Sequence, residues 1–276
     1  MKISLIMATV NRTLEVETFL RHLDRQEYRD FELIVVDQNE DDRLASILLP
    51  YGSRFTIVHL ASERGISKAR NVGLLRASGD LIAFPDDDCW YGPDLLRSVV
   101  ARFAARPDAD IVTGRSIDGT GADSASKFDK TEGPVDRKNV WRRAISYTIF
   151  QRRNVGVLVG GFDENIGVGA NSIYLSGEET DYVLRALPHC RAYYYPDLTV
   201  YHPSPVARYS PQVIKRAYKY GCGFGKVVAK HRYSLPYKGT ALLKPIVGSI
   251  LYGLFLQFPK SNYYWHSFLG RLRGML

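Results

Sequence analysis

The chain has 276 residues, 45% of them hydrophobic, with 37 basic and 29 acidic side chains and a formal net charge of +8 at pH 7. This length and apolar content are enough for one large α/β domain, or for a domain with an appendage. Its three cysteines, Cys89, Cys190 and Cys222, are far apart. They exclude a zinc site of the usual spacing and a disulfide framework, and they suit a reducing compartment.

Strand and helix patterns alternate along the first 114 residues. Short apolar runs predict strands at 3–8, 31–37, 55–60, 80–84 and 109–114. Helical spacing predicts helices at 13–26, 66–77 and 93–103. Nearly continuous apolar strands separated by helices predict a mostly parallel sheet covered on both faces. We read the first run, which Asn11 and Arg12 follow, as a strand and not as a signal peptide.

The middle of the chain is more irregular. Residues 117–139 are polar and rich in turn formers, which predicts a long loop before order resumes at 145–153. The stretch "SGEETDYVLRAL" at 176–187 predicts a helix with an acidic first turn, and "RAYYYPDLTVYHP" at 191–203 predicts a last strand.

The last 79 residues carry the positive charge. Asp197 is the last acid, and 12 Lys and Arg follow it, so that 25 bases face 29 acids in the rest of the chain. A helix is predicted from Ser210 as cap and Pro211 as first residue. Its bases share one arc of the helical wheel: Lys215, Arg216, Lys219, Lys226 and Lys230. The apolar stretch 246–258, between two prolines, is too short to span a membrane and predicts a buried or interfacial helix.

Three consecutive carboxylates, Asp86, Asp87 and Asp88, follow the strand predicted at 80–84. Adjacent carboxylates repel one another, so a pocket holds them only beside a cation. In parallel sheets ligands bind at the carboxyl ends of strands, where both this cluster and Asp37 are expected. The pattern favours a binding pocket over a solvated acidic turn.

The ordered set of motifs resembles the family 2 glycosyltransferases, inverting enzymes of the GT-A fold. Asp37 ends a strand, "GISKARNVGLLRASGD" precedes the D-x-D of Asp86 and Asp88, "GGFDE" precedes "GEETD", and "VYHP" follows. The resemblance covers about residues 2–203, and the tail is similar to bacterial members that act on lipid-linked or capsular glycans. It implies a hexosyltransferase-type enzyme that needs Mn²⁺ or Mg²⁺.

The resemblance also implies an architecture. Residues 1–204 would form a Rossmann-like α/β catalytic domain, with a nucleotide-binding half at 1–115 and an acceptor-binding half at 140–204. A basic, amphipathic helical region would occupy 205–276.

Site residues follow from the resemblance position by position. Asp88 and Asp86 would bind the metal ion, with His202 as a further ligand, and Asp86 would also contact the ribose. The remaining nucleotide-binding candidates are Thr9, Asp37, Lys68, Arg70 and Asp87. Arg70 has an alternative as the ion-pair partner of Asp80 or Glu63, and Arg64 stands where the family often has Asn.

An inverting transfer needs a general base for the acceptor hydroxyl. The family usually has Glu-Asp at the start of a helix, whereas this chain has Glu178-Glu179. Glu179 therefore takes the aspartate's position, and Asp181 is the substitute candidate. Acids in a first helical turn are also ordinary partners of the helix dipole.

Other protein classes explain fewer of these features. A haloacid dehalogenase phosphatase has D-x-D on its first strand, and a dinucleotide oxidoreductase has G-x-G-x-x-G there, where this chain has "MATVNRT". A nucleic-acid-binding protein would explain the basic tail but not the acidic pocket. A non-catalytic sugar-nucleotide binding protein remains an alternative.

The expected partners are a nucleotide-sugar donor, with UDP favoured, a glycan or polyprenyl-linked acceptor, and an anionic membrane surface, but no nucleic acid. The basic tail predicts a cytoplasmic enzyme bound peripherally at the inner face of the cytoplasmic membrane.

Overall fold

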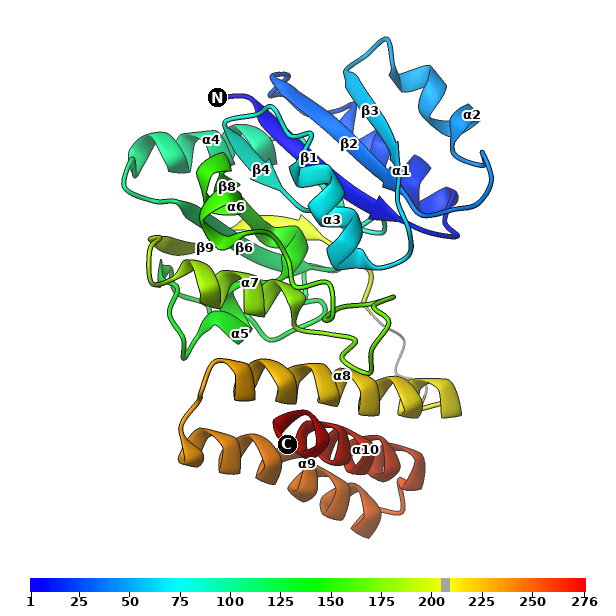
Figure 1. The fold of residues 1–276 in the computed structure, drawn as a ribbon, viewed down its shortest axis with the longest axis vertical. Coiled ribbons are helices and arrows are strands. Elements are labelled where there is room, and N and C mark those ends of the chain that lie inside the picture. Colours follow the sequence, from blue (N-terminus) through cyan, green and yellow to red (C-terminus); the bar gives the residue numbers. More distant parts are fainter. Residues whose placement is uncertain (205–208) are drawn as a thin grey trace. The chain divides into compact units, whose positions relative to one another are not determined.

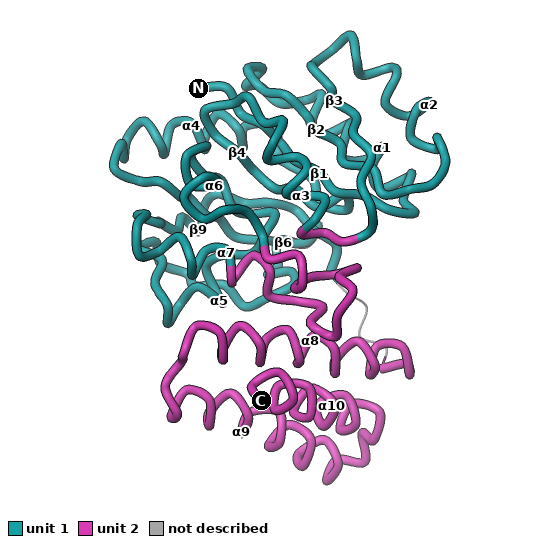
Figure 2. The backbone as a smooth tube through the Cα atoms, in the orientation of Figure 1, with its two compact units in different colours: residues 1–64, 68–162, 182–205 teal, residues 65–67, 163–181, 206–276 magenta. Residues whose placement is uncertain are grey.

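The computed structural model describes residues 1–204 and 209–276, which form two compact units. Unit 1 comprises residues 1–64, 68–162 and 182–205, and unit 2 comprises 65–67, 163–181 and 206–276 (Figure 2). The sequence-predicted boundary between 204 and 205 adjoins residues 205–208, which lie outside the described residues, and it stays a prediction. The division into units differs from the predicted domains in one respect, because residues 163–181 belong to the same unit as the C-terminal helices.

Unit 1 contains a mixed, mostly parallel sheet (Figure 1). Its strands are β1 (Ile3–Thr9), β2 (Phe31–Asp37), β3 (Thr56–Ala61), β4 (Leu81–Ala83), β5 (Trp90–Tyr91), β6 (Ile111–Ile117), β7 (Gly133–Pro134), β8 (Ile149–Arg152) and β9 (Ala192–Tyr201). The order is β3-β2-β1-β4-β8-β6-β9-β5, with β7 beside β9. β1, β2, β3 and β4 pair in parallel, whereas β8 runs antiparallel between β4 and β6. The predicted α/β class and mostly parallel sheet are confirmed.

Helices line both faces of this sheet. The helices are α1 (Leu14–Leu23), α2 (Ala45–Leu48), α3 (Ile66–Leu74), α4 (Leu95–Ala105), α5 (Val140–Arg143), α6 (Arg153–Val159) and α7 (Glu178–Ala186), with 3-10 turns at Leu49–Tyr51 and Ser146–Thr148. Alternate β1 residues such as Leu5 join α1 and α4 in one buried core. Ile6, on the other face, touches Gly73 of α3. This alternation explains why the strands read as continuous apolar runs.

A buried carboxylate joins β1 and β2 to the turn before β4. Glu32 accepts hydrogen bonds from Ser4 Oγ (2.6 Å), Ser78 N (2.8 Å) and Lys2 Nζ (2.7 Å). Burial alone would raise its pKa, but these donors outweigh burial and lower the pKa to about 2. The charged form is therefore stabilised in the folded state.

Replacing Glu32 with glutamine should reduce the free energy of unfolding by about 2–3 kcal/mol at pH 7. Because the folded-state pKa is lowered, this stabilisation is complete above the unfolded pKa of about 4.5 and is lost as pH falls toward 2. Urea unfolding of both proteins between pH 7 and pH 3 should show the difference shrinking below pH 4.5. A difference that does not depend on pH would contradict this role of the charge.

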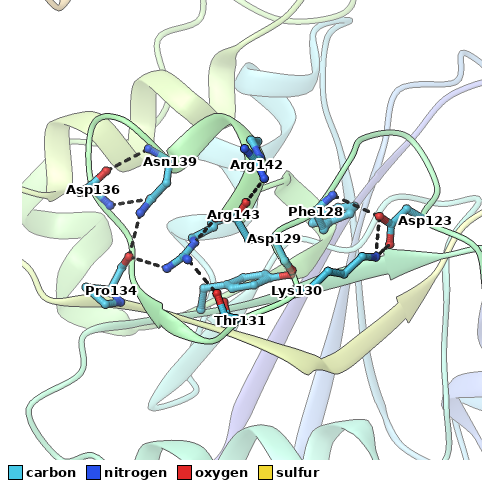
Figure 3. A network of polar contacts seen from close by, with 11 residues as sticks. Asp123, Phe128, Asp129, Lys130, Thr131, Pro134, Asp136, Asn139, Arg142 and Arg143 are labelled. Carbon is cyan, nitrogen blue, oxygen red and sulfur yellow. Dashed lines mark hydrogen bonds and ion pairs between the residues drawn. The ribbon is translucent and has the colours of Figure 1, made fainter.

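Ion pairs hold the predicted long loop at 117–139 in place. Asp129 pairs with Arg142 and Arg143, which come from α5, and Lys130 Nζ lies 2.9 Å from Asp123 (Figure 3). Arg143 also donates to the carbonyl oxygen of Pro134 at 2.9 Å. These contacts attach the loop to the strand pair β7 and β9.

Unit 2 contains three long helices, α8 (Pro211–Lys230), α9 (Leu235–Leu254) and α10 (Phe258–Met275). The Ser210 cap of α8 is confirmed, since its side chain accepts from Val213 N at 3.4 Å. The glycines that weaken α8 as an isolated helix allow its backbone to approach α10. A Cβ atom on Gly270 or Gly274 of α10 would collide with the carbonyl oxygens of Tyr218 and Cys222.

The predicted single helix at 246–258 is wrong. α9 begins at Leu235, continues through Pro245 and ends at Leu254, and α10 begins at Phe258. Proline lacks the N–H that would bond to the carbonyl oxygen of Ala241. Arg271 Nη1 of α10 donates to that oxygen instead, at 2.7 Å. A long-range hydrogen bond thus lets the helix pass through the proline. Across the described ranges, no helix combines the length and the apolar character needed to cross a membrane.

Candidate active site

Strand register brings three predicted nucleotide-binding residues to one edge of the sheet in unit 1. β1 and β2 pair in parallel, so that Thr9 lies opposite Asp37. Ala8 forms a parallel bridge with Asp86, just beyond the end of β4. The carboxyl ends of β1, β2 and β4 therefore meet where Thr9, Asp37 and Asp86 are, as the sequence predicts.

Arg70 of α3 orients the first carboxylate of the cluster. Its Nη2 lies 3.0 Å from Asp86 Oδ1, and its side chain is 1% exposed. The guanidinium carbon also lies 5.4 Å from the ring centroid of Phe162. Asp86 itself stays partly exposed, so one buried cation can hold it at the strand end while leaving it accessible to a ligand.

Asp87 turns inward. Thr9 Oγ1 donates to its Oδ2 at 2.7 Å, and Arg12 Nη1 lies 3.2 Å from its Oδ1. Burial raises the pKa of Asp87 to about 7, against the opposing effects of Thr9 and Arg12. The hydroxyl of Thr9 thus serves Asp87. Through their contacts with Asp87, Thr9 and Arg12 support the loop that carries Asp86 and Asp88.

Asp88 has two cationic neighbours. Arg12 Nη1 lies 2.5 Å from its Oδ2, and His202 Nε2 lies 3.3 Å from its Oδ1. Burial alone would raise the pKa of Asp88, but the hydrogen bonds from His202 and Arg12 outweigh burial and lower the pKa to about 2. Asp88 is therefore ionised throughout the neutral range.

The ring of His202 presents Nε2 to Asp88. Its Nδ1 lies 2.8 Å from the carbonyl oxygen of Pro203, which can only accept, so Nδ1 carries a proton. The ring stacks on Tyr147 with centroids 4.9 Å apart. Burial lowers the pKa of His202, but the hydrogen bond to Asp88 outweighs it and raises that pKa.

The donor atoms suit a divalent cation. Carboxylate oxygens are preferred by Mg²⁺ and Mn²⁺, and an imidazole whose other nitrogen donates to a backbone carbonyl is in the usual state of a metal-binding histidine. A cation between Asp88 and His202 would remove the need for the second ring proton. Within residues 1–204 and 209–276, no three His, Cys, Asp or Glu side chains are already gathered as a metal site. Asp86, Asp88 and His202 offer oxygen and nitrogen donors of the kind that Mg²⁺ or Mn²⁺ takes, and any further ligands would have to come from outside this group.

The two outer nucleotide-binding candidates have other contacts. Asp37 Oδ1 accepts from the backbone and side chain of Asn39 at 2.9 and 2.7 Å, and its Oδ2 lies 2.9 Å from His59 Nε2. Lys68 Nζ lies 2.5 Å from Glu63 at the surface. Asp37 is thereby fixed at the end of β2, and its side chain is buried.

Both base candidates are in the first turn of α7, and residues 178–181 of this turn belong to unit 2. Glu179 is partly exposed. Asp181 is completely buried, with Lys230 Nζ 2.9 Å and His231 Nε2 2.8 Å from its Oδ1. Of the two residues, Glu179 is therefore the more exposed.

Two cavities in unit 1 differ in their relation to these residues. A cavity of about 210 Å³ lies beside Asp88 and is also lined by Leu14, Thr18, Trp90 and Pro203. A larger one, of about 520 Å³, is lined by Arg106, Tyr193 and their neighbours and contains none of the predicted site residues. Asp88 is the predicted site residue that lines the smaller cavity, so this cavity adjoins the carboxylate cluster and we take it as part of the candidate site.

Several site contacts escaped the sequence analysis. Arg12 lies between Asp87 and Asp88, His59 contacts Asp37, and Tyr147 supports His202. Arg12 had a usable signal, because it closely follows the first predicted strand at its carboxyl end. His59 and Tyr147 reach the site through strand pairing and stacking, which no local pattern indicates.

The fold and the strand-end carboxylates define an α/β protein of the GT-A-like class. The sequence profile described as "Glycosyl transferase family 2" matches residues 4–161. The chain belongs to this family, and the predicted family and enzyme class are confirmed.

Curated relatives are similar over part of their length. A Bacillus subtilis protein described as uncharacterized glycosyltransferase YwdF is 25% identical over 170 residues, which cover 60% of this chain and 63% of the relative. A Haloferax volcanii glucosyl-dolichyl phosphate glucuronosyltransferase is 26% identical over 181 residues, covering 60% of this chain and 58% of the relative. The chain spans less than two thirds of the length of these relatives.

Solved structures share the fold over nearly the whole chain. Mannosyltransferase PcManGT from Pyrobaculum calidifontis, in complex with GDP-Man and Mn²⁺, has a TM-score of 0.65 at 19% identity, covering 98% of this chain and 87% of that chain. S. aureus TarS 1-349, in complex with UDP-GlcNAc, has a TM-score of 0.62 at 16% identity, covering 99% and 91%. These similarities show the GT-A-like fold.

Proposed function

We propose that the protein is a metal-dependent inverting glycosyltransferase, which moves a sugar from a nucleotide-sugar donor to a hydroxyl of a glycan or polyprenyl-linked acceptor. The observation that carries this proposal is the strand-end group of Asp86, Asp88 and His202, with Asp88 Oδ1 3.3 Å from His202 Nε2. The GDP-Man and UDP-GlcNAc complexes of the structural neighbours support a nucleotide-sugar donor. UDP remains the favoured nucleotide.

In this proposal Asp88, Asp86 and His202 hold Mn²⁺ or Mg²⁺ against the donor diphosphate. The cation supplies neutralisation of the charge that develops on the leaving diphosphate. Arg70 holds Asp86, and Arg12 and Thr9 hold Asp87, so that the loop is fixed before the donor arrives.

We assign the role of general base, which takes the proton of the acceptor hydroxyl, to Glu179. Asp181 is 0% exposed and its Oδ1 already contacts Lys230 and His231, so its carboxylate is closed to an acceptor hydroxyl within unit 2. Glu179 stands at the family's aspartate position and is partly exposed. As general base it would deprotonate the acceptor hydroxyl while that oxygen attacks the anomeric carbon from the side opposite the diphosphate.

A panel of UDP- and GDP-sugars with Mn²⁺ or Mg²⁺ tests the proposed reaction. We expect metal-dependent release of the nucleoside diphosphate, and proton NMR of the sugar product should show an inverted anomeric configuration. Binding of a donor without turnover, with every acceptor tried, would favour the alternative of a non-catalytic sugar-nucleotide binding protein. Release of inorganic phosphate would favour a Mg²⁺-dependent phosphatase.

We also propose that unit 2 attaches the enzyme peripherally to an anionic membrane, as at the inner face of the cytoplasmic membrane. An apolar stripe on α9 supports this proposal, because its side chains are between 43% and 74% exposed. The stripe has helical spacing and consists of Leu243, Val247, Ile250, Leu251 and Leu254. Phe255, Leu256 and Phe258 extend it into the turn before α10. Such a surface, on helices that carry bases and no acids, suits a negatively charged bilayer interface.

The double variant Ile250→Asn and Leu254→Asn should bind vesicles of anionic phospholipid at least about tenfold more weakly than the wild type, since it removes apolar area from the interface. Co-sedimentation at low and high salt measures this. Leu49→Asn and Leu75→Asn, at exposed positions of unit 1, provide the matched control. Equal binding to neutral and anionic vesicles, or no binding to either, would contradict the proposal.

A further inference from the structure

One face of α8 runs along residues 174–181 inside unit 2. Ser176 Oγ donates to the carbonyl oxygen of Tyr220 at 2.8 Å. One to two turns later, Lys226 Nζ lies 5.3 Å from the ring centroid of Tyr174. The segment that leads into α7 is thus attached to α8 over several turns.

The contacts end at the buried carboxylate of Asp181. Lys230 and His231, the last residue of α8 and the residue after it, both contact Asp181 Oδ1, at 2.9 and 2.8 Å. Lys230 Nζ also lies 2.7 Å from Asp163 Oδ2, at the start of the longer segment 163–181 that belongs to unit 2. A polar group that is 0% exposed needs partners for its oxygens, so Lys230 and His231 fix where Asp181 lies.

Residues 163–177 are irregular, and hydrogen bonds also fix them at their other side: Ile66 N donates to the carbonyl oxygen of Val168 at 2.9 Å, and Ser67 Oγ to that of Ile166 at 2.5 Å. No helix or strand occurs between Val159, where α6 ends, and Glu178, where α7 begins. Another face of α8, which carries Gly221 and Gly225, packs closely against α10, and this contact holds α8 in place. The contacts of Lys230 and His231 with Asp181 therefore add α8 to the elements that fix residues 178–181.

Resting on the proposed function, we propose that Lys230 and His231 are positioning residues for sugar transfer. They hold Asp181, and through one helical turn they hold the backbone of Glu179, which carries the general base. The C-terminal helices then take part in catalysis in addition to any membrane role. This assignment also changes the interpretation of the basic arc of α8, since Lys226 and Lys230 serve contacts within unit 2.

Kinetics of single and paired variants test this role. Lys230→Met and His231→Ala should lower kcat for hydrolysis of the donor that the wild type turns over by about 10²-fold, the scale expected for a displacement of about 1 Å. The KM for the donor should stay within about twofold. Lys230→Arg should restore activity to within about threefold, and Arg232→Gln, which removes a neighbouring exposed charge, should act like the wild type.

A double-mutant cycle separates positioning from general destabilisation. If the pair acts as a unit, Lys230→Met combined with Asp181→Asn should be no slower than Asp181→Asn alone. Additive losses, losses in KM equal to those in kcat, or full activity in folded Lys230→Met and His231→Ala proteins would each overturn the proposal.

Hydrogen exchange gives a readout that does not need turnover. Amides of residues 178–181 should exchange faster in Lys230→Met than in the wild type or in Arg232→Gln, while amides of β1 stay protected. If the wild type proves inactive with every donor, the proposed function fails, and faster exchange still supports the contact. Unchanged exchange at residues 178–181 would overturn the positioning role whatever the activity.

Discussion

Replacing Asp88 with asparagine should lower sugar transfer by about 10³-fold or more and should remove the metal dependence of nucleotide binding. Loss of a metal ligand removes several kcal/mol of stabilisation from the developing diphosphate charge. The fold should persist, because Arg12 keeps its contact with Asp87 and the substitution relieves repulsion within the cluster. Initial rates at saturating Mn²⁺ and calorimetric titration with UDP or GDP measure the two effects.

Asp41→Asn is the matched control for this variant. Asp41 is an exposed aspartate paired with Arg43 in the loop after β2. It should retain wild-type rates and metal dependence. An Asp88→Asn protein with unchanged activity would remove Asp88 from the metal site.

Replacing Glu179 with glutamine should reduce kcat by about 10²-fold or more while leaving nucleotide affinity near that of the wild type. The substitution keeps the shape of the side chain but removes its basicity, and this is the effect expected for loss of a general base. Steady-state kinetics across pH 5 to 9 measure it. The acidic limb of the kcat/KM profile, which reports protonation of the base, should disappear in this variant.

Asp181→Asn provides the comparison. The proposed positioning role predicts a lower kcat with the acidic limb retained, because Glu179 remains as the base. If Asp181→Asn abolishes that limb and Glu179→Gln keeps it, the general base is Asp181, and the motif alignment is displaced by two residues.

Local sequence patterns predicted most of the elements in the first half of the fold, but not α2 or β5. The second strand was predicted at its observed bounds, Phe31–Asp37, because an unbroken apolar run ends there in a polar residue. The strand-end rule then placed Asp37 and Asp86 at one edge of the sheet, where register joins them to Thr9. Buried parallel strands are informative because both of their faces must be apolar.

The remaining features depend on contacts between distant residues. The insertion of β8 between β4 and β6 has no local signal. Pro245 and the glycines of α8 predict weak helices on propensity alone, yet Arg271 and the close approach of α10 stabilise both helices. In the same way, the local sequence makes Asp181 a candidate base, whereas its contacts with Lys230 and His231 come from residues about 50 positions away and have no local signal.

Thermal unfolding with nucleoside diphosphates tests the central claim, a metal-dependent nucleotide-sugar site at Asp86, Asp88 and His202, most directly. We predict that UDP or GDP at 100 times its dissociation constant raises the stability by about 2.7 kcal/mol when Mn²⁺ is present, and that EDTA abolishes this effect. His202→Phe, which keeps the stacking on Tyr147 but removes the nitrogen donor, should reduce the shift. Stabilisation of equal size in EDTA, or no stabilisation by either nucleotide with any divalent cation, would contradict the claim.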